Sequence, residues 1–374
     1  MDIFKPIELA FRRFLLRVLG SVVRRGKPLP PDIDFNTSKI LFVRQDRIGD
    51  VLVSTPLIYA LKQHFPNLVI DFLLSSNNHF VLEHEPLVRK RWVYRKNVVS
   101  AMAILVGVRR ERYDFAIDLM DNPSTTSTII CALAGARWNI GLSKQNEYVY
   151  DVTVPLLSRR ETHIIDRLAM FLTVFGIQSE KEELRVRYVV SSESEAAVRA
   201  FFKEHRLEGR SPIGLNISPG TGVRFWGVPN FQELICDLSL NFPECPLMIL
   251  YQPADRRLAE RVTAPFQTVL LSPETKTFDA FAAFVKSLRL LVTPDTSAVH
   301  LAAAFSIPSV VLYVQSNKDL RIWEPYGSES ETLVTDVDDL TTIPPADVFA
   351  AIVRLLPQKR PDPGHARTMS ARVS

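Results

Sequence analysis

Cysteine is scarce in this sequence. The three cysteines among 374 residues, Cys131, Cys236 and Cys245, are odd in number and widely spaced, so they indicate neither a disulfide framework nor a zinc site and favour a reducing compartment. Two nucleotide fingerprints are also missing: no G-x-G-x-x-G follows the first predicted strand, and no Walker loop ends in Gly-Lys-Ser/Thr. Since these glycine-rich turns hold the phosphates in dehydrogenases and P-loop kinases, both classes are disfavoured.

Net positive charge is absent from the body of the chain and gathers at its two ends. Residues 1–27 contain seven basic and two acidic side chains, and residues 357–374 contain four basic and one acidic. Because the whole chain carries only +4, its body is net negative, which argues against a nucleic-acid partner. An apolar fraction of 47% with 23% charged residues is typical of a soluble globular protein long enough for two domains.

Residues 1–35 form a separate basic arm in the sequence. Apolar residues recur there at three- and four-residue steps with arginines between them, a pattern that predicts an amphipathic helix too polar to span a bilayer. The prolines at 28, 30 and 31 end this pattern. Two hypotheses remain open for residues 1–27: the apolar stripe packs on the body of the protein, or it lies on an anionic membrane surface.

Beyond the arm, short apolar runs alternate with helical patterns, which predicts an α/β fold with parallel sheets covered on both faces. We expect two doubly wound, Rossmann-like domains at residues 36–187 and 188–343, then a terminal helix at 344–356 and a disordered basic tail at 357–374. The predicted strands are 40–43, 68–74, 115–119, 213–217, 246–251, 290–293 and 309–314. The predicted helices are 51–64, 230–240, 277–287, 297–305 and 345–356. Such sheets place ligands at the carboxyl ends of their strands.

Two loops of the second predicted domain have the features of a phosphate site. Asp295, Thr296 and Ser297 lead from a strand into the helix that contains His300, and free N–H groups at a helix start bind phosphate. A simple N-cap role for Asp295 or Thr296 is the alternative, and His300 fits a core position equally well. The other loop brings the backbone of Gly220 and Gly222 close to a ligand, with Thr221 and Arg224 as donors.

The first predicted strand ends in the polar stretch RQDRIGD, residues 44–50. A carboxylate at this position, Asp50, can take a proton from an attacking hydroxyl, and Gly49 before it leaves room for that substrate. The alternative for Asp50 is a helix cap ahead of the following helix. Because the phosphate loops belong to the second domain, this loop is free to contact another substrate.

Five motifs in one order carry a family resemblance: DRIGDVLVSTPL at 46–57, YDFAIDL at 113–119 with LAGARWNIG at 133–141, the Pro-Gly loop with RFW at 224–226, P-x-D at 253–255, and DTSAVHLAAAFSIP at 295–308 with WEPYG at 323–327. Over residues 39–356 the chain resembles glycosyltransferase family 9, the ADP-heptose:lipopolysaccharide heptosyltransferases. The resemblance implies a GT-B fold, two facing Rossmann-like domains with a cleft between them. It also implies metal-independent transfer that inverts the sugar configuration.

The resemblance also implies a role for individual residues. Asp50 matches the general base, Arg224 the basic residue beside the diphosphate, and Asp295 the acidic residue that contacts the donor sugar. The expected donor-binding residues are Gly220, Thr221, Gly222, Trp226, Asp255 at the ribose, Lys276 near the base, Thr296, Ser297 and His300. Arg47 and Gly49 are expected on the acceptor side. No metal or other cofactor is expected.

The implied function is the transfer of a heptose-type sugar from an ADP-heptose-like donor to a lipopolysaccharide core or other glycan, lipid-linked or not. We expect a cytoplasmic enzyme, with possible contact to the inner membrane face through residues 1–27.

The chain departs from the family at 314–317, where it has Val-Gln-Ser-Asn in place of Gly-Pro-Thr, and at Gly227. Use of another nucleotide sugar, or glycan binding without turnover, are the alternatives. The basic residues at 89–96 and 109–112 form either an acceptor patch or a solvated face.

Overall fold

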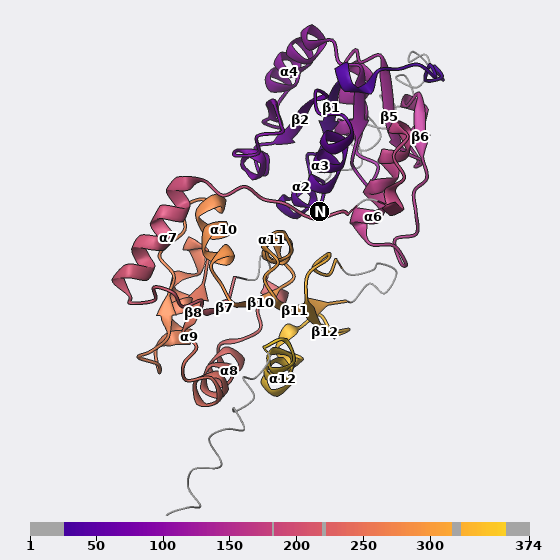
Figure 1. Cartoon of the computed structure of the whole chain (residues 1–374). Helices are drawn as coiled ribbons and strands as arrows, with labels where there is room; N and C mark the ends of the chain where they lie inside the picture. Colours follow the sequence, from indigo (N-terminus) through magenta and orange to yellow (C-terminus); the bar gives the residue numbers. More distant parts are fainter. Residues whose placement is uncertain (1–25, 182, 219–221, 316–322, 357–374) are drawn as a thin grey trace, which may run out of the picture.

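The computed structural model describes residues 26–181, 183–218, 222–315 and 323–356. The helix predicted within residues 1–25, the tail at 357–374 and the loop residues Gly220 and Thr221 lie outside these ranges. Two six-stranded sheets, each with helices around it, form two units (Figure 1). The predicted α/β architecture of two doubly wound halves is confirmed.

The first sheet is parallel throughout, with the strand order β3-β2-β1-β4-β5-β6. Its strands are β1 (Lys39–Val43), β2 (Val69–Ser75), β3 (Lys90–Tyr94), β4 (Phe115–Asp118), β5 (Trp138–Leu142) and β6 (Val152–Val154). Its helices are α2 (Ile48–Leu52), α3 (Thr55–His64), α4 (Val98–Glu111), α5 (Thr125–Leu133) and α6 (Ile164–Ala169). Sequence patterns predict β1, β2 and β4, whereas the single helix predicted at 51–64 is two helices, α2 and α3.

The second sheet repeats this topology, with the order β12-β11-β10-β7-β8-β9. Its strands are β7 (Ile213–Asn216), β8 (Leu247–Leu250), β9 (Leu270–Leu271), β10 (Leu290–Pro294), β11 (Ser309–Val314) and β12 (Ser330–Thr335). Its helices are α7 (Ser192–Glu204), α8 (Val228–Asn241), α9 (Arg256–Thr263), α10 (Phe278–Lys286), α11 (Ser297–Phe305) and α12 (Pro345–Leu355). Strand numbers increase outward from the middle on both sides of each sheet, so the winding reverses at the centre, where α/β folds place ligands.

Strand β1 shows why both faces of the sheet are covered. Ile40 and Phe42 belong to one apolar cluster, and Leu41 and Val43 to another on the opposite face, and all four side chains are buried. Four successive apolar residues therefore suit a strand of a parallel sheet, in which alternate side chains meet helices on opposite sides. The first of these clusters continues into α10 and α11 of the second unit, so the two units share packed apolar surface.

Segment 183–191 carries the chain from the first unit to α7 (Figure 1). The boundary predicted between residues 187 and 188 stays a prediction. No helix within the described residues is long and apolar enough to cross a membrane.

Candidate active site

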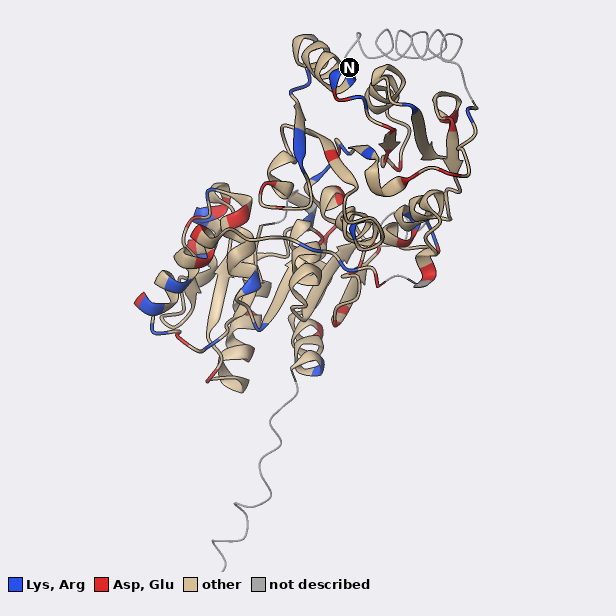
Figure 2. Ribbon diagram, turned by 45° about the horizontal axis from the view of Figure 1, so that its top comes forward, with Lys and Arg blue, Asp and Glu red and all other residues tan. Residues whose placement is uncertain are grey.

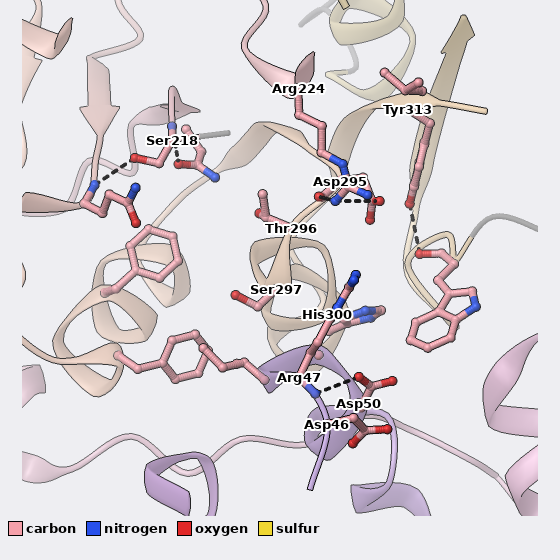
Figure 3. A pocket seen from close by; sticks show the side chains of 18 of the residues that line it. Asp46, Arg47, Asp50, Ser218, Arg224, Asp295, Thr296, Ser297, His300 and Tyr313 are labelled. Carbon is pink, nitrogen blue, oxygen red and sulfur yellow. Dashed lines mark hydrogen bonds and ion pairs between the residues drawn. The ribbon is translucent and has the colours of Figure 1, made fainter. Parts of the chain in front are cut away.

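A cavity of about 1170 Å³ lies where the carboxyl ends of β1, β4, β7, β10 and β11 converge. One wall comes from the loop after β1 and the segment after β4, and the other from the loops around Arg224, Lys276 and α11 (Figure 3). This volume accommodates a ligand of nucleotide-sugar size. The position is the one that doubly wound sheets favour for binding.

The loop after β1 is organised by a buried arginine. Arg44 is fully buried, and its Nε donates to the backbone oxygen of Asp50 at 3.0 Å. The same guanidinium lies 3.3 Å from the carboxylate of Asp46 and 3.3 Å from that of Asp50. Because a buried charge must be compensated, Arg44 fixes the positions of both carboxylates at the cavity edge.

Asp50 lines the cavity and also takes part in the helix start. It is the third residue of α2, and its Oδ2 accepts a hydrogen bond from the N–H of Arg47, the N-cap residue, at 2.9 Å. Its side chain is about 10% exposed, which leaves it in contact with the cavity (Figure 3). The cap and the proposed base are therefore compatible functions of one carboxylate, since each of its oxygens can accept more than one hydrogen bond.

Asp46 is a second carboxylate in this wall. Burial raises its pKa to about 7, and the charge of Asp50 adds to the shift while Arg44 opposes it. Its Oδ1 is buried and accepts no hydrogen bond within the described part of the chain. At neutral pH this group therefore exchanges between its protonated and ionised forms, as a catalytic acid or base does.

Gly49 lies against the second unit at the cavity. A Cβ added to Gly49 would lie 2.9 Å from Cδ2 and 3.1 Å from Nε2 of His300, a residue of α11 in the second unit. The space expected for an acceptor at Gly49 thus holds the His300 ring. Burial, with a smaller effect of His163, lowers the pKa of His300 to about 3, so its imidazole is neutral and supplies no positive charge to a diphosphate.

The opposite wall contains an ion pair. Nη1 of Arg224 lies 3.1 Å from Oδ2 of Asp295 and donates to the Asp295 backbone oxygen at 2.6 Å. Each of the two side chains is about one third exposed, so both remain open to the cavity. Burial raises the pKa of Asp295, while the positive charges of Arg224 and Arg47 lower it. Thr296, not Asp295, is the N-cap of α11: its hydroxyl accepts from the N–H of Ala298 at 3.3 Å.

A third charged group borders the cavity on the side of the first unit. Asp121 pairs with both Arg159, at 3.3 Å, and Arg167. Arg167 is almost fully buried, and its Nε has no hydrogen-bond partner among the described residues. Two guanidinium groups against one carboxylate leave this group of three side chains net positive, which favours an anionic ligand beside it.

Nine of the predicted site residues line this one cavity: Arg47, Gly49, Asp50, Arg224, Lys276, Asp295, Thr296, Ser297 and His300. Three others do not. Trp226 is a core residue, because its ring is buried and its Nε1 donates to the Ile343 backbone oxygen at 2.9 Å. Asp255 ends a short 3-10 helix that does not line the cavity, and its Oδ2 is buried. Gly222 is exposed and does not line the cavity either.

The sequence reasoning missed several lining residues. Asn216 and Ser218 follow β7, and Asp121 and Asn122 follow β4, so the rule that ligands bind at strand carboxyl ends could have found them. Arg159 and Arg167 follow no predicted strand, and only the folded chain brings them to Asp121. Within the described residues, no cluster of three or more His, Cys, Asp or Glu side chains has the arrangement of a metal site.

Comparison with known proteins agrees with this geometry. The profile of glycosyltransferase family 9 (heptosyltransferase) matches residues 102–341. Lipopolysaccharide heptosyltransferase 3 of Escherichia coli is 22% identical over an alignment of 335 residues that covers 83% of this chain and 96% of that protein.

Solved structures show the same fold. A family 9 glycosyltransferase from Veillonella parvula superposes with a TM-score of 0.75 at 19% identity, covering 86% of this chain and 98% of that one. The heptosyltransferase WaaC of E. coli, solved with ADP, gives 0.69 at 17% identity, covering 85% and 100%. Because the family profile spans more than half of the sequence, this chain belongs to glycosyltransferase family 9, the heptosyltransferase family.

Proposed function

We propose that this glycosyltransferase moves a heptose-type sugar from an ADP-heptose-like donor to a lipopolysaccharide core or another glycan, with inversion at the anomeric carbon. The observation that carries the proposal is the placement of Asp50 on one wall of the cavity and of the Arg224–Asp295 pair on the other. Support for the donor comes from a relative, since the E. coli heptosyltransferase WaaC has been solved with ADP and with ADP-2-deoxy-2-fluoro heptose.

The second unit would hold the donor. Arg224 and the start of α11 provide positive charge and N–H groups for a diphosphate, and both lie at the same wall. Asp295 would accept hydrogen bonds from hydroxyls of the sugar. As the bond between the anomeric carbon and the diphosphate oxygen breaks, Arg224 and the helix start stabilise the charge that develops on the departing nucleotide.

The first unit would supply the base. An acceptor hydroxyl oxygen attacks the anomeric carbon, and its proton passes to the carboxylate of Asp50 as the nucleoside diphosphate leaves. A base on one side of the sugar and the leaving group on the other give a single displacement, which inverts the configuration. Asp46 shares Arg44 with Asp50, so a change in the charge of Asp46 alters the electrostatic environment of the base.

The charge on the leaving group would be neutralised by protein groups without a metal ion. We infer a cytoplasmic enzyme, because its nucleotide-sugar substrate is an intracellular metabolite class. The membrane contact through residues 1–27 is a separate proposal, and it falls almost entirely on residues outside the described ranges.

Thermal-shift titration with ADP, UDP and GDP tests the donor. A nucleotide at about one hundred times its Kd stabilises the folded chain by about 2.7 kcal/mol, and we expect this response to ADP, with and without EDTA. Transfer is then followed by mass spectrometry with ADP-heptose and truncated core acceptors. No response to any nucleotide would refute the donor assignment, and a loss of transfer on EDTA treatment would refute the metal-free mechanism.

A different donor sugar is the second candidate, and one feature favours it. Val314 and Gln315 line the cavity at the point where the sequence departs from Gly-Pro-Thr. A bulkier and more polar segment there would change the shape of the sugar pocket. A panel of ADP-sugars compared at equal concentration separates the two candidates: preference for a hexose over heptose would favour this one.

A further inference from the structure

Helix α4 carries an exposed apolar stripe. Val99, Met102 and Val106 are 80%, 60% and 48% exposed, and their spacing of three and four residues places them on one face of the helix. The opposite face packs on the first sheet through Ile104 and Val108, which are buried. Six large apolar side chains are exposed among the described residues, and three of them are these. An apolar patch of this kind marks an interaction surface.

Basic residues border this stripe at both ends of α4 (Figure 2). Arg95 and Lys96 precede the helix, and Arg110 and Arg112 end it, all of them exposed. The only acidic residue of α4, Glu111, lies 2.7 Å from Arg89 and 3.1 Å from Lys90. Its charge is therefore compensated within the protein, and the surface around the stripe is net positive.

This charge decides between three possible occupants of the surface. Residues 1–25 contain six basic and two acidic side chains, so this arm would bring positive charge against positive charge. A second copy of the chain would oppose the same basic residues to themselves. An anionic bilayer offers both negative headgroups and an apolar interior, which complement the basic ends and the stripe.

We propose that α4 is a docking surface for an anionic lipid bilayer. Val99, Met102 and Val106 enter the boundary between headgroups and acyl chains, while Arg95, Lys96, Arg110 and Arg112 contact lipid phosphates. The inference does not rest on the proposed donor or acceptor, because none of these residues lines the cavity. Vesicle binding and sugar transfer can therefore fail independently.

A fluorescent reporter at position 102 tests this proposal. The full-length chain carries Met102→Cys with Cys236→Ser and Cys245→Ser, which remove the cysteines that are not buried, and is labelled with an environment-sensitive dye. We expect a blue shift of the emission with vesicles of phosphatidylcholine and phosphatidylglycerol, and none with phosphatidylcholine alone. The matched control has the dye at Leu240→Cys on α8, a site 79% exposed in the other unit, where no shift is expected.

Co-sedimentation with the same vesicles measures the contribution of the stripe. Val99→Ser combined with Val106→Ser should reduce vesicle association about tenfold, since apolar burial and anionic attraction act together; these side chains are exposed, so the fold is retained. An unshifted dye on anionic vesicles, or unchanged association of the serine variant, would overturn the proposal. A dye already shifted without vesicles would also overturn it. If that shift did not depend on protein concentration, residues 1–25 would be covering the α4 surface. If it grew with protein concentration, a second copy of the chain would be covering it.

Discussion

A methyl group added at Gly49 tests the contact between the two units. In Gly49→Ala the new Cβ would lie 2.9 Å from Cδ2 of His300, closer than carbon atoms pack. His300 is only 5% exposed, and its ring centroid lies 6.1 Å from that of Trp323, so the ring can yield only toward the cavity that it lines. The substitution therefore either forces α2 and α11 apart or pushes the His300 ring into the cavity.

Two opposing effects determine the size of the change. Replacing a helical glycine with alanine gains about 1 kcal/mol of helix propensity, and Gly49 does not need a positive φ. Overpacking a closed contact costs about 1–3 kcal/mol. Because the clash involves a buried ring, we expect overpacking to win, with a net loss of about 1–2 kcal/mol in the free energy of unfolding, measured by urea denaturation.

The matched control is Gly222→Ala, where a Cβ would meet nothing within 4 Å; its stability should change by less than about 0.5 kcal/mol. In the double variant Gly49→Ala with His300→Ala, the clash disappears, so the two effects should be non-additive by about 1–2 kcal/mol. Equal stability of Gly49→Ala and the parent, or strict additivity in the double variant, would refute the contact.

Three further predictions concern charge and the core. Arg224→Ala should lower kcat by about 10²-fold and weaken ADP binding. The control Arg256→Ala removes an exposed ion pair with Glu260 on α9 and should leave kcat and ADP binding unchanged. Equal losses in the two variants would contradict the role of Arg224. Because burial raises the pKa of Asp46 to about 7, the folded chain retains a proton that the unfolded chain loses above about pH 4. Its contribution to stability is thus lost as the pH rises from 4 to 7. Asp46→Asn should flatten this part of the stability–pH curve and shift the pH dependence of kcat, and an unchanged curve would exclude the raised pKa. Trp226→Phe should destabilise the chain by about 1–3 kcal/mol, since it leaves the Ile343 carbonyl unpaired, without changing the Kd for ADP; weaker ADP binding would return Trp226 to the site.

The sequence predicts the central elements of the fold better than its edges. The expected bounds of α11 and β11 agree with the structure at both ends, and β1 begins within one residue of the prediction. These elements are apolar and buried, so hydrophobic pattern determines them. Edge strands β3 and β12 were missed because one side of each faces no neighbouring strand, and charged residues are tolerated there.

The candidate site was predictable where a residue follows a strand and enters a helix, as with Asp50 and Asp295. Contacts between distant segments were not. Nothing in the local sequence indicates that the space at Gly49 is filled by His300, or that Trp226 turns into the core, since both depend on how the two units and the loop at 222–227 pack. Arg44 shows the same limit: its position at the end of a buried strand suggests a ligand contact, but in the fold it neutralises two carboxylates.

The central claim is that Asp50 takes the acceptor proton while the other unit holds the nucleotide. Asp50→Asn tests it well, because an asparagine oxygen can still accept the hydrogen bond from the Arg47 N–H, which preserves the start of α2. The measurement is the transfer rate of this variant with an ADP-heptose donor, with the Kd for ADP determined on the same sample. We predict a loss of about 10²–10⁴-fold in transfer with an unchanged Kd. Transfer near the parent rate, or an equal loss of ADP binding, would contradict the account.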